Sequence, residues 1–461
     1  MVFSSLIFVF IYLPVTLAVY YAVPVRWRNP VLFVLSLAFY GWGEPAYIAL
    51  MLVSIASAYA FGFGIDKYRK TDVKKAKIFL ALSLSVNLAF LLFFKYFNFF
   101  ASLFGAKGIP GLTLPVGISF YTFQIMSYSV DLYRGEVEKA RRFVPFGTYV
   151  TLFPQLIAGP IVRYKDICAQ LTGRKESVPG FASGVNRFVC GLSKKLVLGD
   201  GAAAAAEFFT AQNEFGGSVL GTWAAVVFYT FHIYFDFSGY SDMAIGLGRM
   251  FGFEIPENFN YPYVSGSITE FWRRWHITLS TWFREYVYFP LGGSRKGAGR
   301  TYFNLAVVWF LTGFWHGAGW NYIIWGVYFL LLLVLEKAFL GKIFKKLPAL
   351  GHIWTLLFIG LGWLIFFRTD ISSLGADIGR LFGAGTSSFA PEYPVILLRL
   401  LPFALLCAFA CTGLPKKLFQ KSLARFPALQ YATPVCTLAL ALLCTAYMVD
   451  DTFSPFLYYI F

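Results

Sequence analysis

The longest uncharged run of the chain reads TYFNLAVVWFLTGFWHGAGWNYIIWGVYFLLLLVL and covers residues 301–335. As one helix this run would be about 50 Å long, whereas about 20 residues suffice to cross the hydrocarbon core of a membrane. Glycines cluster in its middle, in Gly313-Phe-Trp-His-Gly-Ala-Gly319. We therefore expect a break there and two membrane-spanning helices instead of one.

The composition of the whole chain agrees with a membrane protein. Of 461 residues, 58% are hydrophobic, 20% are aromatic and 13% are charged, whereas about 25% are charged in an average soluble protein. Disordered, collagenous and coiled-coil chains each require a more polar or more repetitive sequence. Composition therefore favours one polytopic membrane protein over about three soluble domains.

Uncharged runs along the chain predict the number of spans. Residues 2–25 lack both a charge and a basic n-region, so we expect a retained first span and not a signal peptide. Residues 153–160 hold two prolines and a glycine and predict a re-entrant or broken helix. Arg399 interrupts the run 393–415, and 185–209 is the weakest candidate because it carries several charges. The other candidate runs are 31–43, 45–65, 78–94, 108–130, 143–162, 185–209, 215–235, 347–367, 393–415 and 426–449. They predict an all-α polytopic fold with roughly eleven transmembrane helices, plus re-entrant and interfacial helices.

We expect residues 1–461 to form a single integral-membrane domain. In this interpretation residues 1–110 are N-terminal spans, 111–340 are the motif-bearing core and 341–461 are C-terminal spans.

Charge indicates an orientation. The net charge of +16 comes from 39 Lys and Arg against 23 Asp and Glu. In a soluble protein this excess would suggest nucleic acid, but cytoplasmic loops of membrane proteins also collect Lys and Arg, so we expect no nucleic-acid partner. Basic residues follow the first, third and fifth spans, which places these loops in the cytoplasm and the N-terminus outside. They are Arg26, Arg28, Lys67, Arg69, Lys70, Lys74, Lys75, Lys77, Arg134, Lys139, Arg141 and Arg142.

Motif absences exclude several enzyme classes. The chain has no G-x-S-x-G elbow, no H-E-x-x-H, no P-loop and no dinucleotide fingerprint. These absences disfavour a serine hydrolase, a zinc protease, an ATP-driven pump and a Rossmann enzyme. The six cysteines form no C-x-x-C and are interpreted as buried thiols, so we expect no metal site.

The chain has only four histidines, and His316 lies in the middle of the longest apolar run. An ionisable residue within a membrane is costly and is a functional hypothesis by default. A neutral imidazole can take a proton from a hydroxyl, as a general base must. The alternative is a structural histidine that forms hydrogen bonds between helices. His352 is interpreted as interfacial.

A second histidine ends the motif Ser267-Ile-Thr-Glu-Phe-Trp-Arg-Arg-Trp-His276. Large apolar residues recur here at spacings of three and four, which predicts one apolar face of a continuous amphipathic helix. They are Trp272, Trp275, Leu279, Trp282 and Tyr286. Arg273, Arg274, His276 and Arg284 lie off this stripe, and the two adjacent arginines could hold an anionic group such as a phosphate.

His232 begins a stretch that continues as Ile233-Tyr-Phe-Asp-Phe-Ser-Gly-Tyr-Ser-Asp-Met243. A buried carboxylate needs a partner, so Asp236 is expected either to orient a histidine or to bond Arg273, with structural pairing the more ordinary role. Asn258 and Asn260 are interpreted as a loop at the end of a span.

These motifs, in their order along most of the chain, resemble the membrane-bound O-acyltransferase family. The similarity is greatest to the branch that O-acetylates alginate. It rests on His276 after Arg-Arg-Trp, on His316 within Trp-His-Gly, on the segment 271–293 and on six further blocks. The blocks are Met1-Val-Phe-Ser-Ser5, Phe94-Lys-Tyr-Phe-Asn-Phe99, Leu114-Pro-Val-Gly-Ile-Ser-Phe-Tyr-Thr-Phe-Gln124, Phe153-Pro-Gln-Leu-Ile-Ala-Gly-Pro160, Tyr234-Phe-Asp-Phe-Ser-Gly-Tyr-Ser-Asp-Met-Ala244 and Pro455-Phe-Leu-Tyr-Tyr-Ile-Phe461. His232 stands where this branch is expected to carry Gln.

The resemblance implies a helical bundle around a central funnel or tunnel, with His316 as the catalytic residue and His276 as a second active-site residue. It implies an O-acetyltransferase that moves an acetyl group from a cytoplasmic thioester, acetyl-CoA, across a bacterial-type plasma membrane to an extracytoplasmic polysaccharide. An SGNH-type acetyltransferase is the expected protein partner, membrane lipids surround the spans, and no cofactor is expected to stay bound. The residues expected to line the substrate site are Arg273, Arg274, Trp272, Trp275, Trp315, Asn321, Asp236 and Tyr240.

Three alternatives stay open at this point. One is D-alanyl transfer to teichoic acid, which is chemistry of the same family with a carrier protein as donor. Another is a transporter or polymer channel that does no chemistry. The third is a lipid or protein acyltransferase of the same family, because tunnel length is not readable from sequence.

Overall fold

The structure, a computed structural model, describes residues 2–211, 218–385 and 392–450. The block 455–461, one of those on which the family resemblance rests, lies outside the described residues, as does Met1. Every regular element among the described residues is helical, and no strand forms in that part of the chain. The expected all-α fold class is therefore confirmed.

The chain divides into two compact units. The first consists mainly of Met1–Leu192 with Tyr240–Glu257, and the second mainly of Ser193–Gly239 with Asn258–Tyr447. The division of the sequence into three consecutive regions stays a prediction. Helices that begin in the first unit are α1 (Leu13–Ala22), α2 (Arg28–Gly41), α3 (Ile48–Tyr68), α4 (Val73–Leu103), α5 (Ile118–Arg134), α6 (Phe143–Thr151), α7 (Phe153–Leu156), α8 (Tyr164–Gly173) and α9 (Val178–Ser193).

The remaining helices begin in the second unit, and α11 contributes residues to both. They are α10 (Asp200–Ala211), α11 (Val219–Met250), α12 (Ile268–Arg274), α13 (Ile277–Phe283), α14 (Gly297–His316), α15 (Trp320–Leu335), α16 (Gly341–Lys346), α17 (Pro348–Phe367), α18 (Ile371–Leu381), α19 (Glu392–Ala410), α20 (Leu414–Arg425) and α21 (Ala432–Asp450). Short π-helical turns interrupt or extend them at Phe8–Tyr12, Lys194–Gly199, Arg284–Tyr288 and Glu336–Leu340.

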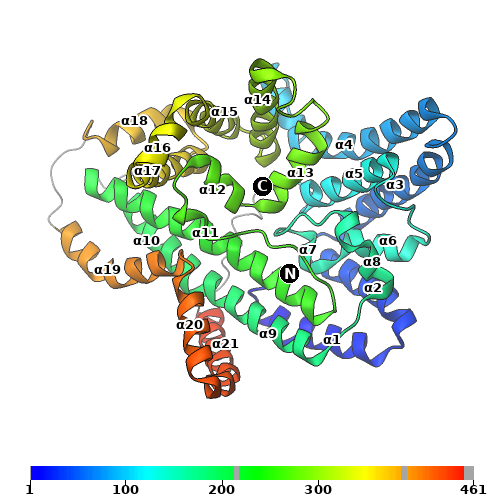
Figure 1. Ribbon diagram of the computed structural model, residues 1–461, viewed down its shortest axis with the longest axis horizontal. Coiled ribbons are helices and arrows are strands. Elements are labelled where there is room, and N and C mark those ends of the chain that lie inside the picture. Colours follow the sequence, from blue (N-terminus) through cyan, green and yellow to red (C-terminus); the bar gives the residue numbers. More distant parts are fainter. Residues whose placement is uncertain (1, 212–217, 386–391, 451–461) are drawn as a thin grey trace. The chain divides into compact units, whose positions relative to one another are not determined.

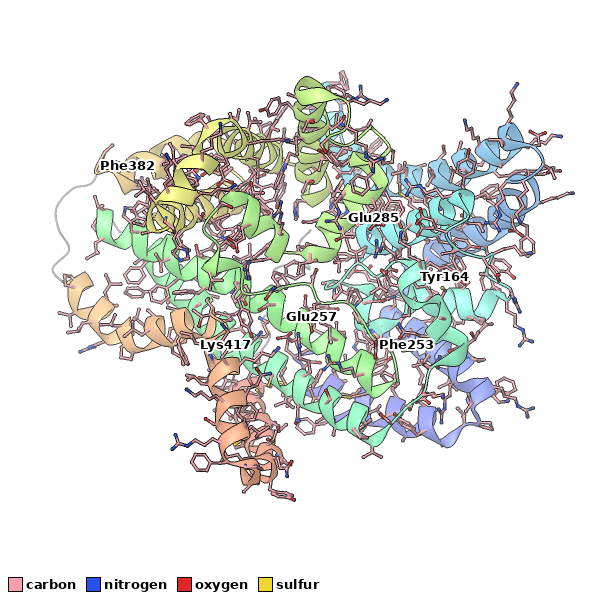
Figure 2. The ribbon with its side chains drawn as sticks, in the orientation of Figure 1. Tyr164, Phe253, Glu257, Glu285, Phe382 and Lys417 are labelled. Atoms are coloured by element: carbon pink, nitrogen blue, oxygen red, sulfur yellow. The ribbon has the colours of Figure 1, made fainter. Side chains whose placement is uncertain are left out.

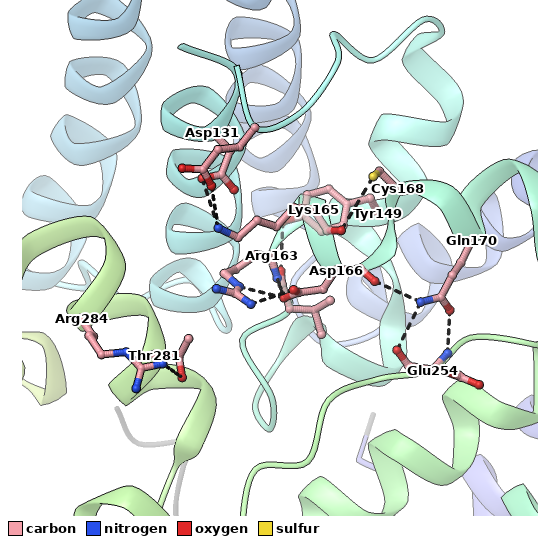
Figure 3. Close-up of polar contacts among 12 residues, drawn as sticks. Asp131, Tyr149, Arg163, Lys165, Asp166, Cys168, Gln170, Glu254, Thr281 and Arg284 are labelled. Atoms are coloured by element: carbon pink, nitrogen blue, oxygen red, sulfur yellow. Dashed lines mark hydrogen bonds and ion pairs between the residues drawn. The ribbon is translucent and has the colours of Figure 1, made fainter. Parts of the chain in front are cut away.

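In the first unit, α3, α4 and α5 pack side by side (Figure 1). Asp72 caps α4, because its carboxylate accepts the backbone N–H of Lys75. Polar groups pair around α5 and α8, where Lys165 Nζ lies 3.8 Å from Asp131 and 2.8 Å from Glu136 (Figure 3). A buried aspartate on α5 thus has a basic partner, as burial of a carboxylate requires.

In the second unit, α14 and α15 form an antiparallel pair, and α15 also packs on α17 (Figure 1). The long uncharged run breaks where its glycines predicted, because α14 ends at His316 and α15 begins at Trp320. Gly326 lets the two helices approach closely, since a Cβ there would stand only 2.5 Å from the Trp309 carbonyl oxygen. Side chains fill the spaces between the helices of each unit (Figure 2).

Five helices are long and apolar enough to cross a membrane within the described residues, or six if the bent pair at Pro394–Ala410 and Leu414–Arg425 counts as one span. The five are Pro45–Tyr68, Val73–Leu103, Trp320–Lys346, Pro348–Phe367 and Pro427–Asp450. A polytopic membrane protein is confirmed, whereas the count of roughly eleven spans is not. The expected first span at 2–25 contains only a shorter apolar helix, Phe8–Ala22.

The segment 153–160 contains the expected broken helix. Only α7 forms there, with four residues, and the following backbone through Arg163 is irregular. The residues of this segment are buried, which is the condition under which irregular backbone is tolerated in a membrane protein.

Candidate functional site

A cavity of about 590 Å³ lies within the second unit, against α12, α13, α14 and α15. Ligand sites typically enclose about 300–1,000 Å³, so this volume suits a small organic substrate. Most of the lining is apolar, with both sequence-selected histidines among the polar exceptions. The lining residues are Thr269, Trp272, Arg273, Trp275, His276, Ile277, Leu279, Ser280, Thr281, Phe283, Arg284, Leu305, Val308, Trp309, Thr312, His316 and Leu333.

His276 stands at a break between two short helices. The continuous helix expected through Trp272 and Tyr286 does not form, because α12 ends at Arg274 and α13 begins at Ile277. His276 has φ 41° and ψ 55°, in the left-handed region, which non-glycine residues occupy only when their surroundings hold them there.

Asn258 compensates for the broken helix. Its backbone carbonyl accepts the N–H of Ile277 at 3.0 Å, and its side-chain Oδ1 accepts the N–H of Thr278 at 3.3 Å. These two donors would otherwise have no partner in the first turn of α13. Asn258 is fully buried in its loop, so the sequence expectation of a loop is confirmed.

The imidazole of His276 is buried, with 2% of its surface exposed, and its Nδ1 lies 3.0 Å from Asn258 Oδ1. The Phe237 ring packs on it edge to face, with centroids 4.8 Å apart. Burial lowers the pKa of His276 to about 3, because the charged imidazolium is poorly solvated there. The ring is therefore neutral near pH 7.

His316 is the last residue of α14 and is 5% exposed. Aromatic rings hold it on two sides, with centroids 5.1 Å away at Trp325 and 5.3 Å away at Phe366. Trp315 lies beside both histidines, 5.0 Å from His316 and 6.3 Å from His276 between ring centroids. The structure thus brings the two histidines, forty residues apart in sequence, to one cavity.

Trp272 and Trp275 belong to an aromatic cluster beside the cavity. Trp272 contacts Trp309 and Phe329 with centroid distances of 5.1 and 4.9 Å, and Trp275 contacts Trp363 at 4.8 Å. Such contacts fix the walls of the cavity. Both residues line the cavity, as expected of substrate-site residues.

The two adjacent arginines have different environments. Arg273 is exposed, lines the cavity and forms no hydrogen bond or salt bridge within the described residues. Arg274 instead pairs with Glu270 at 2.8 Å and donates to the Asn260 carbonyl at 3.1 Å. Arg284, also on the cavity, donates only weakly to Thr281 Oγ1 at 3.4 Å (Figure 3). Arg273 and Arg284, more than Arg274, are thus placed to meet an anionic ligand.

Asp236 has a partner that the sequence did not suggest. Its carboxylate lies 3.2 Å from Nζ of Lys195, which is fully buried and also pairs with Asp200. The expected bond to Arg273 is wrong, since Arg273 forms no salt bridge in the part of the chain that the structure describes. The other expectation, that Asp236 forms a structural pair, agrees with the structure, because the buried Lys195 needs carboxylates around it.

The other expected site residues lie outside the cavity lining. Asn321 is buried and donates through Nδ2 to the Phe366 carbonyl at 2.9 Å, which supports one of the rings that hold His316. Tyr240 belongs to the first unit, where its ring stacks on Phe3 with centroids 4.8 Å apart. Their roles in binding stay predictions.

Fold and site together define a polytopic membrane protein with a buried histidine pair on one apolar cavity. The sequence model of the membrane-bound O-acyltransferase family, MBOAT, matches residues 135–360, which include both histidines. A probable alginate O-acetylase AlgI of Pseudomonas putida is 41% identical over 396 residues, which cover 84% of this chain and 81% of that protein. The chain belongs to the membrane-bound O-acyltransferase family, and the expected enzyme class, an O-acyltransferase, is confirmed.

Two further relatives differ in the group or polymer that their names specify. A peptidoglycan O-acetyltransferase of Helicobacter pylori is 34% identical over 415 residues, covering 81% of this chain and 78% of that protein. A teichoic acid D-alanyltransferase of Bacillus subtilis is 28% identical over 271 residues, covering 54% of this chain and 68% of that protein. Similarity to the acetyltransferases thus extends over more of the chain than similarity to the D-alanyltransferase.

Sequence reasoning missed the buried polar residues that hold the site together. Asn258 supports His276, and Glu336 accepts the backbone N–H groups of Ile268 and Thr269 at the start of α12. Lys195 pairs with Asp236. The one signal in the sequence was that each of these three residues is polar and lies within or beside an apolar stretch. This signal does not reveal which residue each of them contacts.

Proposed function

We propose that the protein is a membrane O-acetyltransferase that takes an acetyl group from a cytoplasmic thioester and passes it across the membrane for O-acetylation of an extracytoplasmic polysaccharide. The observation that carries the proposal is the single cavity lined by both His276 and His316. The names of the Pseudomonas putida and Helicobacter pylori relatives support acetyl as the group and a polysaccharide as the acceptor.

Acetyl-CoA is the donor that this site suits. Its phosphates are anionic, and guanidinium groups bind phosphate oxygens through charge-assisted hydrogen bonds. Arg273 and Arg284 line the cavity, and Arg273 forms no hydrogen bond or salt bridge among the described residues. Most of the remaining cavity surface is apolar, which suits the uncharged acetyl thioester.

In the proposed reaction, His316 acts as general base. It removes the proton of the acceptor hydroxyl as the hydroxyl oxygen attacks the thioester carbonyl carbon. The C–S bond then breaks, and the departing CoA thiolate takes this proton from His316, which restores the neutral base. General-base assistance is typically worth about 10²–10⁴-fold in rate. His276 orients the hydroxyl or the thioester carbonyl, and the reaction requires no covalent intermediate on the enzyme.

The finer assignments belong to the same proposal. The protein resides in a bacterial-type plasma membrane with its N-terminus outside, as the basic loops indicate. An SGNH-type acetyltransferase outside the membrane is the proposed partner for the last step to the polysaccharide.

The test is to reconstitute the purified protein in proteoliposomes with acetyl-CoA labelled in the acetyl group and an acidic polysaccharide, with and without an SGNH-type partner. Label recovered on the polysaccharide or on the partner as an alkali-labile acetate ester supports the proposal. Vesicles that move label or polymer without forming an ester would instead identify a transporter. Esters formed only from a D-alanyl carrier-protein donor would identify D-alanyl transfer, the activity in the name of the Bacillus subtilis relative.

A further inference from the structure

Three donors converge on one oxygen atom beside the active-site histidine. Asn258 Oδ1 lies 3.3 Å from the backbone nitrogen of Thr278, 2.8 Å from the Thr278 hydroxyl and 3.0 Å from Nδ1 of His276. All three residues are buried. In such surroundings a polar atom must be matched with a partner of the right kind, because a mismatch is not relieved by water.

The backbone N–H of Thr278 fixes the orientation of the Asn258 amide. Oxygen and nitrogen of an amide have nearly the same shape, and only their partners tell them apart. A backbone N–H can only donate, so the atom that faces it must be the amide oxygen. The same oxygen faces Nδ1 of His276.

An oxygen acceptor at Nδ1 decides the tautomer of the histidine. In a neutral imidazole one ring nitrogen carries the proton and the other carries a lone pair. Because Asn258 Oδ1 offers no proton, Nδ1 must donate, and Nε2 is left with the lone pair. His276 lines the cavity, so this lone pair belongs to the site in which the substrate would bind.

We propose that Asn258 is a positioning residue that holds His276 in the Nδ1–H tautomer, so that Nε2 of His276 accepts a hydrogen bond from an N–H or O–H group of the substrate beside the reacting hydroxyl. This inference rests on the proposed acetyl transfer and sharpens it. Of the two roles open to His276, orienting the thioester carbonyl is excluded for the neutral ring, because a carbonyl oxygen needs a donor. His276 therefore orients the substrate through this neighbouring group, while His316 takes the single proton of the reacting hydroxyl.

Two backbone hydrogen bonds hold the loop around Asn258 in place. The backbone N–H of Asn260 donates to the Arg274 carbonyl at 2.9 Å, and the Ile277 N–H donates to the Asn258 carbonyl at 3.0 Å. These bonds join the loop to the residues before and after His276. They therefore fix the position of the Asn258 amide relative to the imidazole. The left-handed backbone at His276 is part of the same arrangement.

Nitrogen NMR of the full-length protein tests the proposal directly, because the chain has only four histidines. With ¹⁵N-labelled histidine, the His276 signals are identified as those lost in His276→Gln. The expected result at pH 7 is a protonated Nδ1 and an unprotonated Nε2. A protonated Nε2 in the wild-type protein would overturn the inference.

Variants at Asn258 test the consequence for catalysis. Asn258→Leu removes the acceptor, so His276 should lose the fixed tautomer and kcat for acetyl transfer should fall about 10- to 100-fold, less than the about 10²–10⁴-fold that a general base itself contributes. Asn258→Asp keeps an acceptor at the same place and should restore the tautomer. Its carboxylate stabilises the imidazolium, so the acid limb of the pH profile should move to higher pH, a change that a purely structural residue would not cause.

Asn260→Leu is the matched control. Asn260 is exposed in the same loop and uses its backbone N–H for its bond, so tautomer and kcat should stay as in the wild type. If Asn258→Leu folds and keeps both the tautomer and kcat, the inference fails. If the tautomer is as expected but the wild-type protein transfers no acetyl group, the proposed function fails while the assignment of the tautomer stands.

Discussion

Arg273 and Arg274 are neighbours in sequence, but only Arg273 lines the cavity, whereas Arg274 forms a salt bridge with Glu270. We predict that Arg273→Gln raises KM for acetyl-CoA about 10-fold, equal to about 1.4 kcal/mol, and changes kcat little. The reason is that the guanidinium would contact donor phosphates that do not react. Steady-state kinetics with acetyl-CoA as the varied substrate measure this effect.

Arg274→Gln is the comparison for that prediction, because it removes the same charge one residue away. Its main effect should be on stability, through the lost bonds to Glu270 and the Asn260 carbonyl. Equal changes in KM for the two variants would contradict the prediction. They would mean that the overall positive charge attracts acetyl-CoA, and not the position of Arg273 on the cavity.

The buried neutral His276 also predicts how stability depends on pH. Its pKa is about 3 in the folded protein against an ordinary value of 6.5. Between these values the unfolded chain binds a proton that the folded protein does not, so the free energy of unfolding falls as pH falls from about 6.5 towards 3. We expect His276→Gln to lose less stability than the wild type between pH 7.5 and pH 5. The unfolding midpoint in detergent at the two pH values is the measurement.

His352→Gln is the control for the pH experiment, since His352 lines a different cavity, beside α17 and α19. The part of the stability loss that His276→Gln removes should persist in His352→Gln, because His276 is intact there. The account would be contradicted if His352→Gln abolished the loss of stability on acidification and His276→Gln left it unchanged. His352 and not His276 would then be the titrating histidine.

At the scale of elements, two glycines position His316 by letting α14 and α15 pack closely. A methyl group at Gly313 would collide with the Tyr322 carbonyl oxygen, and one at Gly326 would stand 2.5 Å from the Trp309 carbonyl oxygen. We predict that Gly326→Ala separates the helices, shifts His316 and lowers kcat at least about 10-fold, because small displacements of a catalytic group are costly. Acetyl-transfer assays on purified protein check this.

Gly299→Ala is the matched substitution on the same helix α14, where an added methyl meets nothing within 4 Å. It should leave activity unchanged and slightly favour the helix, since Ala has the higher helix propensity. Wild-type activity in Gly326→Ala would show that the close contact does not position His316.

Sequence periodicity predicted some of these elements and not others. The break in the 301–335 run followed from its glycines and its excess length, and both are properties of the local sequence. The break at His276 did not follow, because it depends on two acceptor oxygens of Asn258, eighteen residues earlier in the chain. The partner of Asp236 was missed for the same reason, since Lys195 comes from a distant π-helical turn.

At the scale of the whole molecule, apolar composition predicted the all-α membrane class but not the number of spans. A run of uncharged residues shows that a segment can be buried, and protein can bury it as well as lipid. The runs at 2–25 and 143–162 contain a 15-residue helix and a broken pair of helices, so they do not supply full-length spans. Five or six helices in the described residues meet the requirement of length.

The family assignment rested on the order of motifs along the chain, and the comparisons confirm it. The site was partly predictable, because both histidines, Arg273, Trp272 and Trp275 line one cavity. Arg274 and Asn321 do not line it. Residue type and spacing in the sequence identify side chains that could bind a substrate. Whether such a side chain reaches the cavity depends on its partners elsewhere in the fold, which the sequence does not show.

Sidedness of acetyl transfer tests the central claim most directly. Sealed proteoliposomes would carry labelled acetyl-CoA on one face and an acceptor oligosaccharide, with an SGNH-type partner, on the other. Wild-type protein and His352→Ala should deliver acetate esters to the far face. His316→Ala should reconstitute equally well, by size-exclusion profile, and deliver none. A correctly folded His316→Ala protein with near-normal transfer would contradict the account.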